Sequence, residues 1–112
     1  RRGVQVTVYD RYDRAGGLMT YGIPSFKLEK PVVMQRIEQL DAAGVTFVMN
    51  CKVGEDLSFD AIRGRHDAVL IATGVYKTRD LEAPGSDAAG IVRAIDYLTA
   101  SNRKGFGDEV AA

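Results

Sequence analysis

The amino-acid sequence predicts an α/β fold with parallel strands, and three features of the 112-residue chain lead to this prediction. Residues 4–10 alternate valine with polar residues and end at Asp10, a pattern typical of a strand that finishes in a carboxylate. Residues 29–43 carry apolar side chains three and four positions apart, as an amphipathic helix does. Residues 67–72 contain the run AVLIA, which indicates a parallel strand buried on both faces.

The composition describes an ordinary soluble chain of at most one domain. Hydrophobic residues make up 46% and the formal net charge is zero, so neither a nucleic-acid footprint nor a disordered chain is indicated. The longest apolar run is far too short to cross a bilayer, and no apolar signal core follows Arg1. The single cysteine, Cys51, excludes an internal disulfide and is expected to pack as a small hydrophobe. We therefore expect a cytoplasmic protein with no membrane partner.

Asp10 lies where the first predicted strand ends. In dinucleotide-binding α/β units, an acidic residue at the end of the second strand accepts hydrogen bonds from ribose hydroxyls, because a carboxylate offers two acceptor oxygens. A solvated loop aspartate is the alternative that this position alone leaves open. The sequence contains no G-x-G-x-x-G motif, so the phosphate loop that normally precedes such an aspartate by about 20 residues is expected before Arg1.

A glycine pair, Gly16 and Gly17, follows the predicted strand. Glycine permits positive φ and lets backbone N–H groups approach a ligand, although a plain turn is also compatible. The next residues, LMTYGIPSFKL, are apolar and aromatic where a simple surface connection would be polar, so we expect another group to cover them. Gly22 and Pro24 argue against a regular helix in this stretch.

The middle of the chain continues the alternation of helix and strand. The helix over residues 29–43 is expected to carry Pro31 in its first turn and to stop at Gly44. A second strand is predicted over residues 45–49, followed by a loop and a short helix that Ser58 caps. His66 precedes the third predicted strand and is expected to be a solvent-exposed loop residue with no catalytic role.

The C-terminal third begins where the third predicted strand ends. Its exit, Ala72, Thr73 and Gly74, consists of small residues on the side of a parallel sheet where ligands gather, although a tight turn would use the same residues. Pro84 then marks an irregular connection, and residues 91–98 show a helical stripe. Residues 102–112 are polar and are predicted to form a linker.

Four stretches of the chain together resemble one protein family. They are YDRYDRAGGLMTYGIPSFKLEK, NCKVGEDLS, AVLIATGVYKTRDLEAPG and YLTASN. They are similar to the flavin domain of the small subunit of NADPH-dependent glutamate synthase, in a group that includes the flavin domain of dihydropyrimidine dehydrogenase. The resemblance implies that residues 1–101 are part of a Rossmann-like FAD/NAD(P)-binding domain without its first βα unit, and that residues 102–112 lead toward an NADPH domain.

The resemblance also implies a function. Electrons would pass from NADPH through FAD to iron–sulfur centres and a large subunit, which makes glutamate from glutamine and 2-oxoglutarate. NADPH and the clusters would be bound outside this stretch, so the 112 residues alone are expected to be inactive. No catalytic residue or metal ligand is nominated. The alternatives are another reductase of the dihydropyrimidine dehydrogenase-like group and a non-catalytic docking domain.

Each residue expected to bind FAD is small, offers its backbone to the ligand or carries a polar side-chain group. Asp10 would hold the ribose, Lys27 would lie near the pyrophosphate, and Val53 corresponds to the position where the family's backbone meets adenine, although a surface β-turn is also possible there. The full expected set is Asp10, Arg11, Gly17, Leu18, Lys27, Val53, Ala72, Thr73 and Gly74.

Overall fold

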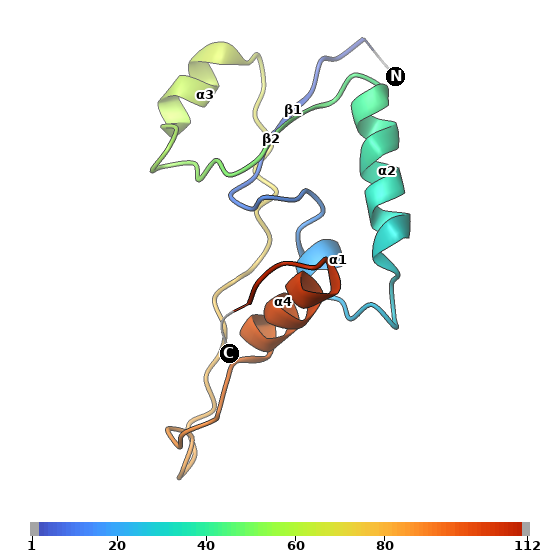
Figure 1. The fold of residues 1–112 in the computed structure, drawn as a ribbon. Coiled ribbons are helices and arrows are strands. Elements are labelled where there is room, and N and C mark those ends of the chain that lie inside the picture. The colour runs from blue at the N-terminus through green and yellow to red at the C-terminus, as the bar shows by residue number, and fades with distance from the viewer. Residues whose placement is uncertain (1–2, 111–112) are drawn as a thin grey trace.

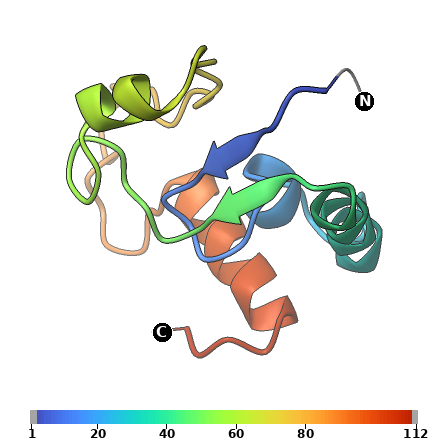
Figure 2. The ribbon, with the colours of Figure 1, turned by 90° about the horizontal axis from the view of Figure 1, so that it is seen from above.

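The computed structural model describes residues 3–110 and has an α/β architecture, which confirms the predicted class (Figure 1). Two strands and four helices follow one another along this part of the chain. They are β1 (Thr7–Tyr9), α1 (Leu18–Tyr21), α2 (Lys30–Ala42), β2 (Thr46–Val48), α3 (Phe59–Arg65) and α4 (Ala94–Gly105). Figure 2 shows α1 beside α4, with α2 and α3 on opposite sides of the strand pair.

The two strands are parallel and in register, with Thr7 opposite Thr46 and Tyr9 opposite Val48. Backbone hydrogen bonds continue past the strand ends, since the Asp10 N–H donates to the Val48 carbonyl at 3.0 Å and the Cys51 N–H donates to the Asp10 carbonyl at 2.9 Å. Parallel strands joined through a helix form a β–α–β unit, which is compatible with part of a Rossmann-like sheet. The complete flavin-binding fold remains a prediction.

Helix α2 was predicted to within one residue at each end. Pro31 occupies its first turn, where a missing N–H costs nothing. Val33 is buried on its inner face, and the helix stops before Gly44, whose φ of +92° is easily reached only without a Cβ. Helix α3 begins after Ser58, whose hydroxyl accepts the Ala61 N–H at 3.1 Å as expected of an N-cap.

The predicted third strand does not form in the described residues. Residues 67–72 join no ladder, and Leu70 and Ile71 are 88% and 69% exposed. A strand is stable only when its backbone groups are paired with a neighbour, and the sheet of the described chain contains β1 and β2 alone. The buried two-faced strand predicted here is therefore wrong for this structure.

The predicted linker at residues 102–112 is also partly wrong, while residues 111 and 112 lie outside the described part. Helix α4 begins three residues later than the predicted stripe and continues to Gly105. Asn102 is 2% exposed and donates to the carbonyls of Tyr21 and Leu98 at 2.9 and 3.0 Å. A buried polar side chain bonded in this way stabilises the packing of α4, which periodicity of apolar residues alone does not reveal. The division of the chain into domains stays a prediction.

A single helical turn, α1, forms between the glycine pair and Gly22. The prediction of no regular helix holds beyond Gly22, but residues 18–21 complete one turn, and the Gly22 N–H donates to the Leu18 carbonyl at 2.8 Å. Two of its residues, Thr20 and Tyr21, are the most completely buried side chains in the described chain. The core is therefore small and is centred on the glycine loop rather than on the strands.

Gly16 is required by space as well as by backbone angle. Its φ is +107°, and a Cβ built there would lie 2.3 Å from Oγ1 of Thr20 and 3.2 Å from a Val33 methyl group. We predict that Gly16→Ala lowers the free energy of unfolding by roughly 1–3 kcal/mol more than Gly44→Ala does. Gly44 is the matched control, since its φ is also positive but its Cβ would meet open space. Equal losses in urea titrations of the two variants would contradict this packing.

Candidate functional site

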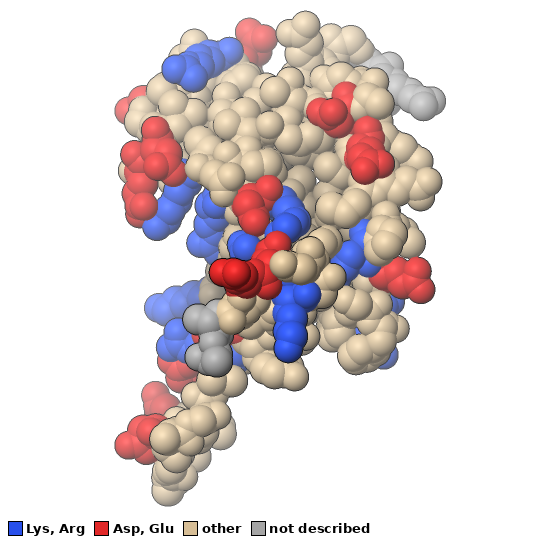
Figure 3. All heavy atoms as spheres, viewed as in Figure 1, with Lys and Arg blue, Asp and Glu red and all other residues tan. Residues whose placement is uncertain are grey.

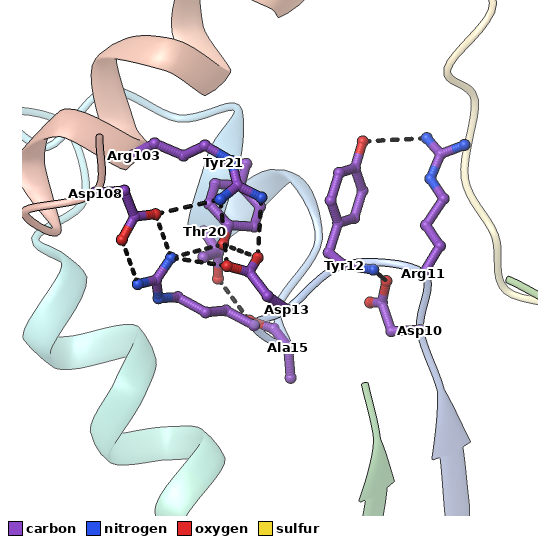
Figure 4. Close-up of polar contacts among 10 residues, drawn as sticks. Asp10, Arg11, Tyr12, Asp13, Ala15, Thr20, Tyr21, Arg103 and Asp108 are labelled. Atoms are coloured by element: carbon purple, nitrogen blue, oxygen red, sulfur yellow. Dashed lines mark hydrogen bonds and ion pairs between the residues drawn. The ribbon is translucent and has the colours of Figure 1, made fainter. Parts of the chain in front are cut away.

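Asp10 directly follows β1, as predicted, and shapes the start of the loop. One carboxylate oxygen, Oδ1, accepts the Tyr12 N–H at 3.0 Å and closes a local turn (Figure 4). Its second oxygen accepts no hydrogen bond from the described residues, and the side chain is half-buried. One acceptor therefore remains for a ligand, while the turn fixes the orientation of the carboxylate. Binding of a ribose by Asp10 stays a prediction.

The Arg11 guanidinium lies over two neighbouring tyrosine rings. Its guanidinium carbon lies 4.9 Å from the centre of the Tyr12 ring and 4.4 Å from that of Tyr76, and it donates to the Tyr12 hydroxyl at 3.1 Å. The two rings are 6.1 Å apart, and burial raises the pKa of the Tyr76 phenol. Cation–π stacking orients a guanidinium while leaving N–H groups at its edge for an anion. The sequence suggested Arg11 but not the two tyrosines.

The Gly17–Leu18 backbone is the part of the loop with free donors. Gly17 has φ +53° and ψ −126°, and neither its N–H nor that of Leu18 donates to another group in the described chain. A Cβ at Gly17 would lie 3.5 Å from the Tyr76 hydroxyl. Tyr76 thus joins the segment after Gly74 to the loop. The structure brings together three of the expected regions: the tip of β1, the glycine loop and the segment around Gly74.

An open cavity of about 340 Å³ adjoins Arg11. Its walls come from the Arg11 tyrosine stack and from one side of α4, so it lies between segments far apart in sequence. The lining residues are Arg11, Tyr12, Tyr76, Ile95, Asp96, Thr99, Ala100, Arg103 and Val110. Rings, a hydroxyl and charged groups of both signs line this space, a mixture suited to a ligand with a planar ring and polar edges.

Lys27 and Val53 are not drawn into this group. Lys27 is exposed in the loop between α1 and α2, and Val53 lies in the loop between β2 and α3. Figure 1 shows these two loops well apart. Val53 belongs to a β-turn in which the Glu55 N–H donates to the Lys52 carbonyl at 3.0 Å. Ala72 and Thr73 are exposed as well. The ligand roles expected of these four residues remain predictions.

A compact group of charges links the start of the glycine loop to the end of α4, and we call Asp13, Arg14, Arg103 and Asp108 the charge cluster. Arg14 makes two bonds to the Asp108 carboxylate, at 2.6 and 2.7 Å, and Arg103 makes two to Asp13, at 3.0 and 3.2 Å (Figure 4). Further contacts join Arg14 to Asp13 and Arg103 to Asp108, each at 3.2 Å. Paired guanidinium–carboxylate contacts of this kind are geometrically specific.

Tyr21 connects the charge cluster to the core. Its hydroxyl donates to Asp13 and accepts from Arg14, and its ring lies under the Arg103 guanidinium at 4.7 Å. Burial and the bond to Asp13 raise the pKa of this phenol. Burial also raises the pKa of Asp13, but the bonds from Tyr21 and Arg103 outweigh it and lower that pKa below 3.8. The bond to Arg14 lowers the pKa of Asp108.

Lys30, which the sequence analysis did not single out, fastens the other end of the loop. It is 7% exposed, and its ammonium group donates to the Met19 carbonyl at 2.9 Å and to the Ile23 carbonyl. Burial lowers the pKa of this amine. These carbonyls lie at the end of α1, where backbone acceptors lack partners within the helix. Lys30, at the start of α2, therefore caps the C-terminal end of α1. Lys27, the nearby residue that was expected to bind the ligand, is exposed.

His66 does not have the environment predicted for it. It is half-buried, its Nε2 lies 3.1 Å from the Tyr9 hydroxyl, and the two rings meet edge to face with centres 5.9 Å apart. The prediction of an exposed loop residue is therefore wrong, because the imidazole packs against the side chain of Tyr9 in β1. Cys51 is buried, as predicted, at the end of the β2 ladder.

The molecular surface and the remaining side chains add few further candidates. Acidic and basic groups are interspersed over the face seen in Figure 3, in keeping with the zero formal net charge. Among residues 3–110, no three or more His, Cys, Asp or Glu side chains gather in a way that could hold a metal ion. None of the helices in this part of the chain is long and apolar enough to cross a membrane.

Comparison with known proteins supports the resemblance, although no protein-family model matches the chain. The putative glutamate synthase [NADPH] small chain of Cereibacter sphaeroides is 77% identical over 98% of this chain, and the glutamate synthase [NADPH] small chain of Azospirillum brasilense is 57% identical over 99%. The putative oxidoreductase AegA of Escherichia coli K12 is 43% identical over 97%. The chain spans 27%, 23% and 16% of the lengths of these relatives.

The lowered pKa values of the cluster carboxylates predict a pH dependence of stability. An aspartate whose pKa falls below its ordinary 3.8 on folding stabilises the fold above that pH, and the stabilisation is lost as the pH falls through the folded value. Asp108→Asn should therefore lower the free energy of unfolding at neutral pH, and its deficit relative to the unsubstituted protein should disappear well below pH 3.8.

Urea titrations across this pH range test the expected loss. Asp80→Asn is the matched control, because Asp80 also pairs with an arginine, Arg93, but both side chains are more than half exposed. Exposed pairs contribute little, so this variant should differ little from the unsubstituted protein at any pH. A deficit of Asp108→Asn that persists unchanged in acid would contradict an ionic role for this carboxylate.

Proposed function

We propose that this chain forms part of the flavin-binding region of an NADPH-dependent oxidoreductase of the glutamate synthase small-chain type. The observation that carries the proposal is 77% and 57% identity, over nearly the whole chain, to proteins of that name. The chemistry that FAD supplies when bound is transfer of electrons from NADPH toward iron–sulfur centres and a large subunit, which would form glutamate from glutamine and 2-oxoglutarate. We propose a cytoplasmic location for such an enzyme.

The residues present fit a dinucleotide in three respects. One carboxylate oxygen of Asp10 has no hydrogen-bond donor among the described residues and could accept from ribose hydroxyls. The backbone N–H groups of Gly17 and Leu18 have no acceptor in the described part of the chain and could donate to phosphate oxygens. Arg11 is pre-oriented by its ring contacts and could place an N–H edge against an anion. These three elements support the assignment of FAD as the ligand.

The other expected residues would act through charge, backbone or small size. Lys27 would place its ammonium group near the pyrophosphate, Val53 would offer its backbone near adenine, and the small residues Ala72, Thr73 and Gly74 would allow close approach. We assign no acid, base or nucleophile to this chain. Its own residues would bind and orient the flavin, while NADPH and the clusters would be held elsewhere in the complete protein.

A second candidate is a reductase with a different electron acceptor. It is favoured by the 43% identity to a putative oxidoreductase of Escherichia coli, which has a different name from the glutamate synthases. A docking domain that has lost flavin is the third alternative. The chain's residues alone do not distinguish the two reductases, because the acceptor would contact other parts of the protein.

The proposal is tested on protein made from the complete gene. It should purify with flavin, seen by its visible absorbance, and should oxidise NADPH with glutamine and 2-oxoglutarate once the large subunit is added. Flavin with NADPH oxidation only by artificial acceptors would favour the second reductase. Protein that never binds flavin would overturn both enzyme assignments and favour the docking domain.

The local turn at Asp10 allows a selective test of its ribose role. Asp10→Asn keeps an oxygen to accept the Tyr12 N–H but replaces the free acceptor by an NH₂ group. We expect FAD affinity to fall by roughly 1–3 kcal/mol, because a charge-assisted hydrogen bond is lost. The control is Asp41→Asn, at an exposed position near the end of α2. Equal FAD dissociation constants for both variants, measured by flavin fluorescence, would contradict the ribose assignment.

Lys27 provides a separate test of where the diphosphate lies. Because the side chain is exposed, Lys27→Ala should leave the fold intact and weaken FAD binding slightly. Lys27→Glu should weaken it further, since the new carboxylate repels the diphosphate. The difference between the two variants should shrink as salt is added. Indistinguishable affinities at low salt would show that the phosphates do not lie near this loop.

A further inference from the structure

We infer that the charge cluster is a positioning device, which sets the geometry of the Gly16–Leu18 loop for the flavin and couples it to α4. The inference rests on the proposed function, because it names how the loop of that same site is held. No contact between the cluster and a ligand is required. The cluster residues are positioning residues that act through the loop backbone.

The cluster holds the glycine loop from both of its ends. Asp13 and Arg14 immediately precede Ala15 and the glycine pair, and Tyr21 closes the turn that follows. Arg14 binds Asp108, which follows α4 in the sequence, and it also donates to the Tyr21 hydroxyl at 3.0 Å. A single guanidinium thus fixes the distance between the entry and the exit of the loop.

Buried hydrogen bonds transmit this constraint through the loop itself. Thr20 is fully buried and donates to the Ala15 carbonyl at 2.7 Å, across the glycine pair. Asn102 of α4 donates to the Tyr21 carbonyl from the other side. With Ala15 and Tyr21 held, the remaining freedom of residues 16–18 is small. The two unpaired N–H groups at Gly17 and Leu18 are therefore directed by the cluster.

The internal charge balance of the cluster favours positioning over direct ligand binding. Two guanidinium groups meet two carboxylates, and each carboxylate contacts both arginines. The cluster thus presents no surplus charge to a phosphate. The four side chains are only 21–35% exposed, so their attraction is screened less than that of a surface pair. The Arg14 guanidinium is also stacked over the Phe106 ring at 4.6 Å, which fixes its plane.

The test measures FAD dissociation constants for variants of the Arg14–Asp108 pair in protein from the complete gene. Neither residue lines the cavity next to Arg11, so a loss of affinity is not a lost cavity contact. We expect Arg14→Met and Asp108→Asn each to weaken FAD binding about tenfold, and the double variant no more than the worse single variant, because neighbouring residues in one network are not additive. Arg14→Lys, which retains the charge, should recover part of the affinity.

Arg93→Met is the matched control. Arg93 forms a two-bond pair with Asp80 at the start of the same helix, but this pair is exposed and does not touch the loop. Its FAD affinity should equal that of the unsubstituted protein. The milder Asp108→Asn keeps the test decisive if Arg14→Met fails to fold, and unfolding temperatures recorded beside each titration separate lost affinity from lost structure.

Distinct outcomes overturn the inference and the proposed function. Unchanged FAD affinity in Arg14→Met and Asp108→Asn, with flavin bound normally by the unsubstituted protein, would overturn the positioning role and leave the proposed function standing. Additive losses without recovery in Arg14→Lys would also overturn it, since the pair would then not act as one unit. No flavin binding by the unsubstituted protein would overturn the proposed function, and the inference with it.

Discussion

Tyr21 is the side chain on which the rest of the structure depends. The residue is 2% exposed, and its ring contacts those of Tyr12 and Phe106, with ring centres 5.4 and 6.3 Å away. Its hydroxyl enters the charge cluster and its carbonyl accepts from Asn102. Aromatic contacts, an ionic network and a buried amide bond therefore meet at one residue. The contact between α1 and α4 joins segments far apart in the sequence, since the Asn102–Tyr21 bond spans 81 residues.

This arrangement explains how a loop rich in glycine can be well defined. Glycine residues cost conformational entropy on folding, so a glycine loop keeps one shape only when its surroundings impose it. Here the Thr20 hydroxyl bonds across the glycine pair to the Ala15 carbonyl. Lys30 of α2 binds the backbone at the C-terminal end of the loop, and the charge cluster joins the N-terminal end of the loop to α4. The N–H groups of Gly17 and Leu18 remain as polar groups of the loop that find no acceptor among residues 3–110. A binding loop of this kind combines rigid ends with open donors.

Local patterns in the sequence were sufficient for the elements that local forces determine. Pro31 and Gly44 marked the ends of α2, Ser58 marked the start of α3, and alternating valines led to a strand that ends at Asp10. Each of these signals acts within a few residues. The parallel pairing of β1 and β2 followed from the helix between them.

The features that the sequence did not predict depend on contacts between residues far apart in the chain, which no local pattern encodes. The Arg14–Asp108 pair spans 94 residues and the Asn102–Tyr21 bond spans 81, so the sequence pattern predicts only a shorter helix and a linker for α4 and the residues after it. The periodicity of apolar residues identifies buried helix positions only where they are apolar. Asn102 is buried but polar, so this pattern does not reveal it. The opposite error occurred at residues 67–72, where an apolar run predicted a strand although no neighbour pairs with it in the described chain.

The most direct test of this account is hydrogen exchange at single backbone amides, with and without FAD. The Thr20 and Tyr21 amides donate to the Gly17 carbonyl, so they should be protected before ligand is added. The Gly17 and Leu18 amides should exchange rapidly at first and become protected only when FAD binds. Protection of all four amides without FAD, or no change at Gly17 and Leu18 in its presence, would contradict the account.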